Sequence, residues 1–180
     1  MPVVIGSKPE STFSDPVGLL TDCHRRIERF LGVLVQVSNQ AAPLNDDERA
    51  SLDTALRYFR EAAPKHTADE EESLFPRLRA LQRAELTPVL QKMDALENDH
   101  DLAEGIHGEI DRLGQSWLAE GSLAESSRLQ FSQLVTQLTD LYRSHIALEE
   151  RELFPAAAAA LPLTDRVAMG REMAARRGAK

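Results

Sequence analysis

Two copies of one eleven-residue motif carry the side chains best suited to chemistry in this chain. HTADEEESLFP begins at His66 and HIALEERELFP begins at His145, and seven of the eleven positions are identical. In each copy a glutamate, Glu70 or Glu149, follows the histidine by four residues, so both side chains lie on one face of a helix. Imidazole nitrogens and carboxylate oxygens are metal ligands. Two such motifs on two helices therefore predict a site for a pair of metal ions.

Helices are expected to position both motifs, because strong helix formers occur throughout and no alternating β-type runs are present. The pattern favours helices over residues 15–40, 46–81, 84–120, 123–160 and 164–177. It predicts an all-α fold, an up-down-up-down four-helix bundle with a short additional C-terminal helix. We expect one domain over residues 15–180, after a flexible N-terminal segment of residues 1–14. Pro64, Pro76 and Pro155 are expected to kink or interrupt their helices.

Each long helix also carries a histidine on its apolar stripe, the face that points into the core. These core-facing histidines are His24, His66, His100 and His145. If the helices run up and down, all four fall at one depth, within about one helical turn. His107 lies at another depth. It is expected to be a core histidine or to orient a metal ligand without binding the metal itself. Glu70 and Glu149 share the stripes, and an uncompensated carboxylate there is costly, so metal is the expected compensation.

Other acidic residues near the motifs have different expected roles. Glu71, Glu72 and Glu150 are expected to form solvated charged faces, because a side chain five residues after a histidine is turned about 140° away from it. Glu28 and Glu104 each follow a core-facing histidine by four residues. Two roles stay open for each of them, either entering the site as a further ligand or orienting a ligand from outside.

The composition excludes several classes of function. The net charge is −8, and the only basic cluster lies in the final residues, so we expect no nucleic-acid partner. A single cysteine, Cys23, excludes an internal disulfide and is expected to be a small buried residue. The chain shows no secretory signal and no apolar run near the ~18 residues that span a bilayer. A cytoplasmic protein with no membrane partner is expected.

With these residues in place, the chain resembles the hemerythrin-like, HHE-type cation-binding domains. In that family histidines and HxxxE pairs surround a non-haem di-iron centre, and the matching residues here are His24, His66, Glu70, His100, His145 and Glu149. The LFP triplets and the ending GREMAARRG are also similar to bacterial members. The resemblance implies two iron ions in an oxo- or hydroxo-bridged centre, with zinc or manganese as substitutes. Oxygen-carrying members have a histidine at the position of Glu104 and an aspartate at that of Glu150, which argues against simple oxygen transport.

Three functions are compatible with this ligand set. Six protein ligands do not fill two octahedral ions, so an open position is expected to take a small ligand. The preferred function is therefore binding or sensing of O2, NO or peroxide, as in a bacterial stress response. The alternatives are an oxidoreductase that consumes peroxide or NO, and a protein for iron storage or handling. The sequence identifies no redox partner, and whether the chain is an enzyme stays open.

Overall fold

The computed structural model describes residues 11–40 and 43–179, and within these ranges the chain is helical without a β-strand. The longer helices are α1 (Pro16–Ser38), α2 (Asp46–Glu61), α5 (Thr87–Glu120), α6 (Glu125–Leu148) and α8 (Leu163–Arg176). Shorter segments are α3 (Ala63–Ala68), the π-helical turn η1 (Asp69–Leu74), α4 (Phe75–Ala80), the 3-10 turn η2 (Ala84–Leu86), the π-helical turn η3 (Glu149–Leu153) and α7 (Phe154–Ala160). The expected all-α fold is confirmed.

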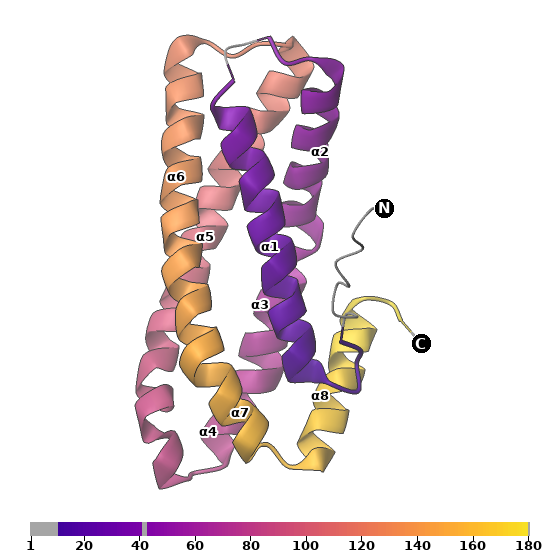
Figure 1. Ribbon diagram of the computed structural model, residues 1–180, viewed down its shortest axis with the longest axis vertical. Helices are drawn as coiled ribbons and strands as arrows, with labels where there is room; N and C mark the ends of the chain where they lie inside the picture. Colours follow the sequence, from indigo (N-terminus) through magenta and orange to yellow (C-terminus); the bar gives the residue numbers. More distant parts are fainter. Residues whose placement is uncertain (1–10, 41–42, 180) are drawn as a thin grey trace, which may run out of the picture.

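The helices form long columns that lie side by side (Figure 1). One column continues from α2 through α3 and η1 into α4, and another continues from α6 through η3 into α7. Helix α1 packs against α2 and α6, and α5 packs against the same two helices. Figure 1 shows α8 beside the lower part of α1, where it also packs against η1. Segments far apart in the sequence therefore meet in the middle and lower parts of the molecule.

Local signals in the sequence set the ends of these helices. The Asp15 side chain accepts a hydrogen bond from the Gly18 backbone N–H at 3.1 Å and caps α1. Asn45 and Glu48 form a reciprocal capping box at the start of α2. Gly121 ends α5 with φ of 76°, a left-handed conformation that glycine adopts without strain. The predicted end of this helix at residue 120 is confirmed.

The prolines interrupt the columns as predicted, but the form of the interruption was not predicted. The expected single helix over residues 46–81 is wrong, because the column breaks at Ala62 and again at η1. The predicted helix over residues 123–160 is likewise divided by η3. In both π-turns the backbone hydrogen bond spans five residues, from Phe75 N–H to Glu70 and from Phe154 N–H to Glu149. A proline follows each phenylalanine, and its ring and missing N–H disfavour a continuous α-helical ladder.

The buried apolar residues form two clusters with a polar layer between them. The upper cluster includes Leu34, Leu56, Ile110, Trp117, Phe131 and Leu138. The lower cluster includes Leu20, Leu74, Phe75, Met93, Leu96 and Leu153. Along α1, for example, His24 lies between Leu20 of the lower cluster and Ile27 of the upper one. The core is therefore apolar at both ends and polar in the middle.

Residues before α1 pack closely against α8. Ser11 donates its backbone N–H to Asp22 at 2.6 Å, and Phe13 packs against the lower cluster. A Cβ atom added at Gly170 would lie only 1.9 Å from the Phe13 carbonyl oxygen. The predicted flexible segment thus makes contacts at residues 11–14, and its residues 1–10 lie outside the described part of the chain.

Substituting Gly170 tests this close approach. Gly170→Ala is expected to lower the free energy of unfolding by about 1–3 kcal/mol, because the backbone near Phe13 must move. Gly105 also lies inside a helix, but a Cβ added there would have no atom of the described residues outside its own helix within 4 Å. Gly105→Ala is therefore expected to raise the free energy of unfolding by about 0.5–1 kcal/mol. Urea denaturation measures both values, and equal stabilisation by the two substitutions would contradict the contact.

Within residues 11–40 and 43–179, no helix combines the length and apolar character that crossing a membrane requires.

Candidate metal centre

The six residues predicted as ligands come together in the polar layer of the core. They reach it from four columns, and all six are buried: His24 from α1, His66 from α3, Glu70 from η1, His100 from α5, His145 from α6 and Glu149 from η3. The ring centroids of His24 and His66 are 4.9 Å apart, and those of His100 and His145 are 4.7 Å apart. The structure thus brings the four histidines together, as their common depth predicted.

The six residues form two overlapping groups, and both glutamates belong to each group. His24 and His66 complete one group, and His100 and His145 complete the other. Within a group, one ligand atom from each residue lies within 4.8 Å of all the others. Each group therefore offers two imidazoles and two carboxylates, a donor set suited to iron, manganese or zinc.

Each glutamate faces one histidine of each group. Oε2 of Glu149 lies 3.0 Å from Nε2 of His24, and Oε1 of Glu149 lies 3.2 Å from Nε2 of His145. Oε1 of Glu70 lies 3.4 Å from Nε2 of His66, and Oε2 of Glu70 lies 3.3 Å from Nε2 of His100. Each carboxylate therefore directs one of its oxygens toward one group and the other oxygen toward the second group.

Despite these short distances, several buried polar atoms of the cluster make no hydrogen bond within the described residues. Within the described part of the chain, all four oxygens of Glu70 and Glu149, together with Nε2 of His24, lack a partner with hydrogen-bond geometry. A buried polar atom without a partner costs about 1–3 kcal/mol, and more for a charged group. A cation placed among these atoms would satisfy the carboxylates and the imidazole lone pairs at once. The residues therefore fit a metal-binding site.

The two glutamates also differ in their proton affinity. Burial raises the pKa of Glu70 well above its ordinary value, and the negative charge of Glu149 raises it further. Burial acts on Glu149 in the same direction, but contacts with His145 and His24 outweigh it and lower its pKa. Without a cation, Glu70 therefore holds a proton more tightly than Glu149 does, and metal binding must compete with that proton.

The histidines differ in the same way. Burial alone would lower the pKa of His24 and of His145, but contact with Glu149 raises both. Burial lowers the pKa of His66 well below its ordinary value, and the nearby charge of His24 lowers it further. His66 is therefore held in its neutral form, the form that binds a metal ion.

Three carboxylates outside the cluster orient its histidines. The contacts join Nδ1 of His24 to Glu150 at 3.0 Å, Nδ1 of His100 to Glu71 at 2.7 Å, and Nδ1 of His145 to Asp99 at 3.2 Å. Because a carboxylate accepts each bond, Nδ1 carries the hydrogen and Nε2 presents its lone pair to the cluster. Within the described residues, Nδ1 of His66 has no such partner.

The prediction that Glu71 and Glu150 are only solvated surface residues is wrong. Both lie in π-turns, where the ordinary helical rotation does not apply, and both contact a histidine of a neighbouring column. Sequence reasoning missed Asp99 entirely. One signal was present, because each of these three acids is adjacent in sequence to a residue of the cluster. Glu72 is exposed as expected and pairs with Arg176.

The remaining candidates lie outside both groups. Glu28 is exposed and pairs with Arg25, and Glu104 is exposed at the rim of a cavity that also touches His100. The structure therefore does not bring either glutamate into the cluster. His107 bonds to the Tyr142 hydroxyl at 3.0 Å, and burial lowers its pKa to about 4. It is a neutral histidine of the core, one of the two roles expected for it.

Helix α8 fastens the π-turn that carries Glu70. Asp69 is fully buried and accepts hydrogen bonds from Arg176 at 2.9 Å and from Arg177 at 2.5 Å. Ser73, at the other end of η1, donates its hydroxyl to Glu172 at 2.5 Å. The basic residues at the end of the chain thus serve an internal contact. The sequence pattern did not indicate this role.

The fold and the cluster together define a helical protein with a buried histidine and carboxylate site for metal cations. A family model for the hemerythrin HHE cation binding domain matches residues 15–157, and the chain belongs to this family. The family predicted from the motifs is therefore confirmed. A protein of Haemophilus influenzae, which carries the name "uncharacterized protein", is 32% identical to this chain over 183 residues. The matched region covers 94% of each of the two proteins.

Proposed function

We propose that the six clustered residues bind two iron ions, and that this non-haem di-iron centre binds or senses O2, NO or a peroxide. The observation that carries the proposal is the sharing of Glu70 and Glu149 between two groups of ligands. Two carboxylates directed to two histidine pairs favour a binuclear site over two separate ones. The proposal includes an up-down-up-down four-helix bundle around the site and action in the cytoplasm.

In this proposal each part of the site has a distinct task. His24 and His66 would hold one ion, His100 and His145 would hold the other, and Glu70 and Glu149 would serve both. When bound, iron supplies redox activity and open coordination positions for a small ligand. Glu71, Asp99 and Glu150 fix the orientation of three histidines through their Nδ1–H groups. The apolar clusters above and below keep bulk water away from these groups.

A cavity beside the cluster supports a small ligand. It has a volume of about 190 Å³ and is lined by His100 together with Phe59, Ala63, His107 and Tyr142. Its volume is below the ~300–1,000 Å³ that is typical of sites for drug-sized molecules. A diatomic gas or hydrogen peroxide fits such a space, whereas a drug-sized molecule does not.

Metal content is the test of this proposal. Protein produced with iron and purified without chelator is expected to contain about two irons per chain by elemental mass spectrometry. The loaded protein is then expected to change its optical spectrum on addition of O2, NO or peroxide, without continuous consumption of the ligand. One zinc per chain would contradict the di-iron site. Steady-state consumption of peroxide would instead identify an oxidoreductase.

Removal of the metal is expected to destabilise the fold, because the buried oxygens of Glu70 and Glu149 have no hydrogen-bond partner within the described residues. A ligand at 100 to 1,000 times its Kd stabilises the native state by about 2.7–4.1 kcal/mol. For a chain of this size, a chelator is therefore expected to lower the Tm by about 5–15 °C. Calorimetry measures the change, and added iron is expected to reverse it. An unchanged Tm, with the metal verifiably gone, would show that the cluster is stable without a cation.

A further inference from the structure

One hydrogen-bonded pair of side chains lines the cavity beside the cluster. The Tyr142 hydroxyl from α6 and Nε2 of His107 from α5 are 3.0 Å apart, and both residues line the cavity together with His100. The His107 ring stacks on Phe59, with 4.5 Å between the centroids. Within the described residues, Nδ1 of His107 is buried and has no hydrogen-bond partner. The pair therefore lies beside a cluster histidine and has unused hydrogen-bonding capacity.

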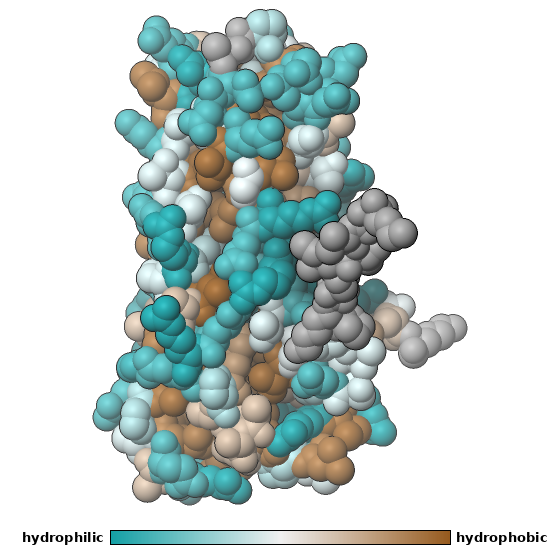
Figure 2. Space-filling view, in the orientation of Figure 1, coloured by the Kyte–Doolittle hydropathy of each residue, from teal (hydrophilic) through white to brown (hydrophobic). Residues whose placement is uncertain are grey.

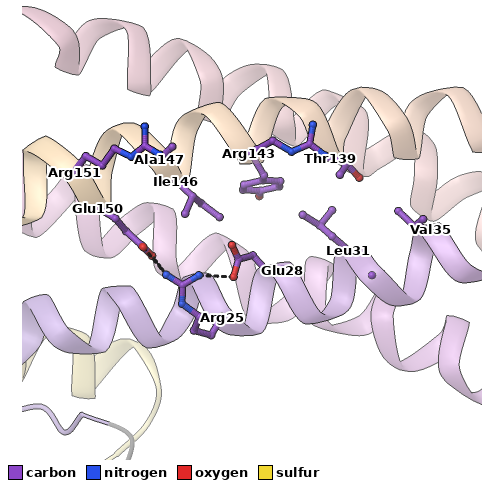
Figure 3. A pocket seen from close by; sticks show the side chains of 12 residues that line it. Arg25, Glu28, Leu31, Val35, Thr139, Arg143, Ile146, Ala147, Glu150 and Arg151 are labelled. Atoms are coloured by element: carbon purple, nitrogen blue, oxygen red, sulfur yellow. Dashed lines mark hydrogen bonds and ion pairs between the residues drawn. The ribbon is translucent and has the colours of Figure 1, made fainter. Parts of the chain in front are cut away.

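Tyr142 also separates this cavity from a groove between α1 and α6. The groove has a volume of about 500 Å³, and Tyr142 lines both spaces. Figure 3 shows Leu31 and Val35 of α1 opposite Ile146 of α6 in the groove, and Figure 2 shows apolar surface among hydrophilic residues on this side. His107 lines the cavity but not the groove. Because the Tyr142 hydroxyl bonds to His107, the hydroxyl lies on the cavity side.

The pair carries one hydrogen more than its own hydrogen bond uses. Burial lowers the pKa of His107 to about 4 and raises the pKa of Tyr142 above its ordinary value. At neutral pH the imidazole therefore has a single N–H, and the phenol keeps its hydrogen. The bond between the two side chains uses one of these two hydrogens. Within the described residues, no side chain accepts the other one.

The position of this spare hydrogen depends on the tautomer of His107. If Tyr142 donates to Nε2, the spare hydrogen is on Nδ1, which is buried without an acceptor, and this arrangement costs stability. If Nε2–H donates to the phenol oxygen instead, the spare hydrogen is on the Tyr142 hydroxyl and can point into the cavity. Only the second arrangement lets a ligand in the cavity accept it.

We propose that Tyr142 donates its hydroxyl hydrogen to the ligand in this cavity, while Nε2–H of His107 holds the phenol oxygen in place. This inference rests on the proposed di-iron function, because the ligand would occupy an open iron position beside His100, which lines the same cavity. A hydrogen bond to a charged acceptor is stronger than one to a neutral acceptor. The pair therefore favours an anionic ligand such as deprotonated peroxide.

Azide, a small linear anion, is the probe for this role. Tyr142→Phe keeps the ring and removes only the donor, so optical titration of the oxidised, iron-loaded protein is expected to show azide binding weakened about tenfold. Tyr58→Phe is the matched control, since Tyr58 is the second tyrosine of the chain, stacks on Phe30 and does not line the cavity. Its azide affinity is expected to change less than about twofold.

Iron content and azide binding of the wild-type protein separate two kinds of failure. A wild-type protein that holds no iron would overturn the proposed function and this inference together. An iron-loaded wild-type protein that binds azide no more tightly than the Tyr142→Phe variant would overturn only the role of Tyr142.

His107→Phe tests whether the two side chains act as one unit. It keeps a ring against Phe59 but removes the N–H that holds the phenol oxygen, so azide binding is expected to weaken several-fold. The double variant, with phenylalanine at both positions, is expected to bind azide no more weakly than Tyr142→Phe alone, because both changes break one hydrogen-bonded unit. Losses that add would show that His107 acts independently and would overturn the pair.

The tautomer of His107 provides a measurement that needs no iron. NMR of the metal-free, nitrogen-labelled protein distinguishes a hydrogen on Nε2 from one on Nδ1, and the expected position is Nε2. A hydrogen on Nδ1 would mean that Tyr142 donates to His107 and has none free for a ligand. That result would overturn the proposal whatever metal the cluster binds.

Discussion

Replacing Glu149 with alanine is expected to remove nearly all of the bound metal. This residue directs one oxygen toward the His24 group and the other toward the His145 group, so its loss damages both ion positions together. Glu70→Ala is expected to have the same effect for the same reason. The measurement is metal content per chain by elemental mass spectrometry, after expression with iron. We expect a fall from about two ions per chain to a small fraction of one.

Two variants control for nonspecific damage to the core and for lost surface charge. His107→Ala removes a half-buried histidine that lies outside both groups, and Glu104→Ala removes an exposed carboxylate near the cluster. Both are expected to retain most of the metal.

Glu150→Ala should show an intermediate effect, with metal affinity reduced about 10- to 100-fold, because Glu150 orients His24 without joining the cluster. Equal loss of metal in all of these variants would show that the site is drawn wrongly.

Removing both Arg176 and Arg177 is expected to cause the largest loss of stability among single-site or paired changes outside the core. The double alanine variant leaves Asp69 fully buried without its two cationic partners. An uncompensated charge of this kind costs about 3–5 kcal/mol. Urea denaturation measures the loss, and the expected change is a lower midpoint with little change in slope.

Arg171→Ala supplies the control for this experiment. Arg171 is an exposed arginine of the same helix, and its replacement is expected to change stability by less than about 0.5 kcal/mol. If the double variant lost no more than the Arg171 variant, Asp69 would not depend on α8. Because Asp69 is adjacent to Glu70, the double variant should also bind metal more weakly than the wild-type protein.

The candidate ligands could be predicted from the sequence because their pattern is local and repeated. The HxxxE spacing placed Glu70 and Glu149 beside their histidines, and equal distances from the turns selected His100 over His107 for the common layer. The structure brings these residues together and leaves His107 outside. Helical periodicity was sufficient here, since each residue had only to be placed on a face and at a depth.

Contacts between columns could not be predicted in this way. Glu71 and Glu150 reach neighbouring histidines only because the chain forms π-turns at these points, and a pattern based on 3.6 residues per turn assigns them to solvent. For Glu104 the periodic pattern makes the opposite error, because it suggests a residue near the site that the structure leaves outside. It has the HxxxE spacing after His100, but α5 continues there without interruption, and the residue stays exposed outside the groups.

The contact between Asp69 and Arg177 also bears on how the protein is made in the cell. The two residues are 108 positions apart in sequence, and His24 meets a glutamate 126 positions further on. Chains are synthesised from the N-terminus, so His24 leaves the ribosome long before its partners Glu149 and Glu150 exist. Unlike a zinc finger, whose ligands lie within a few dozen residues, this cluster is complete only after Glu149 has been synthesised. In the proposed di-iron protein, both ion positions therefore become available only after η3 has been translated.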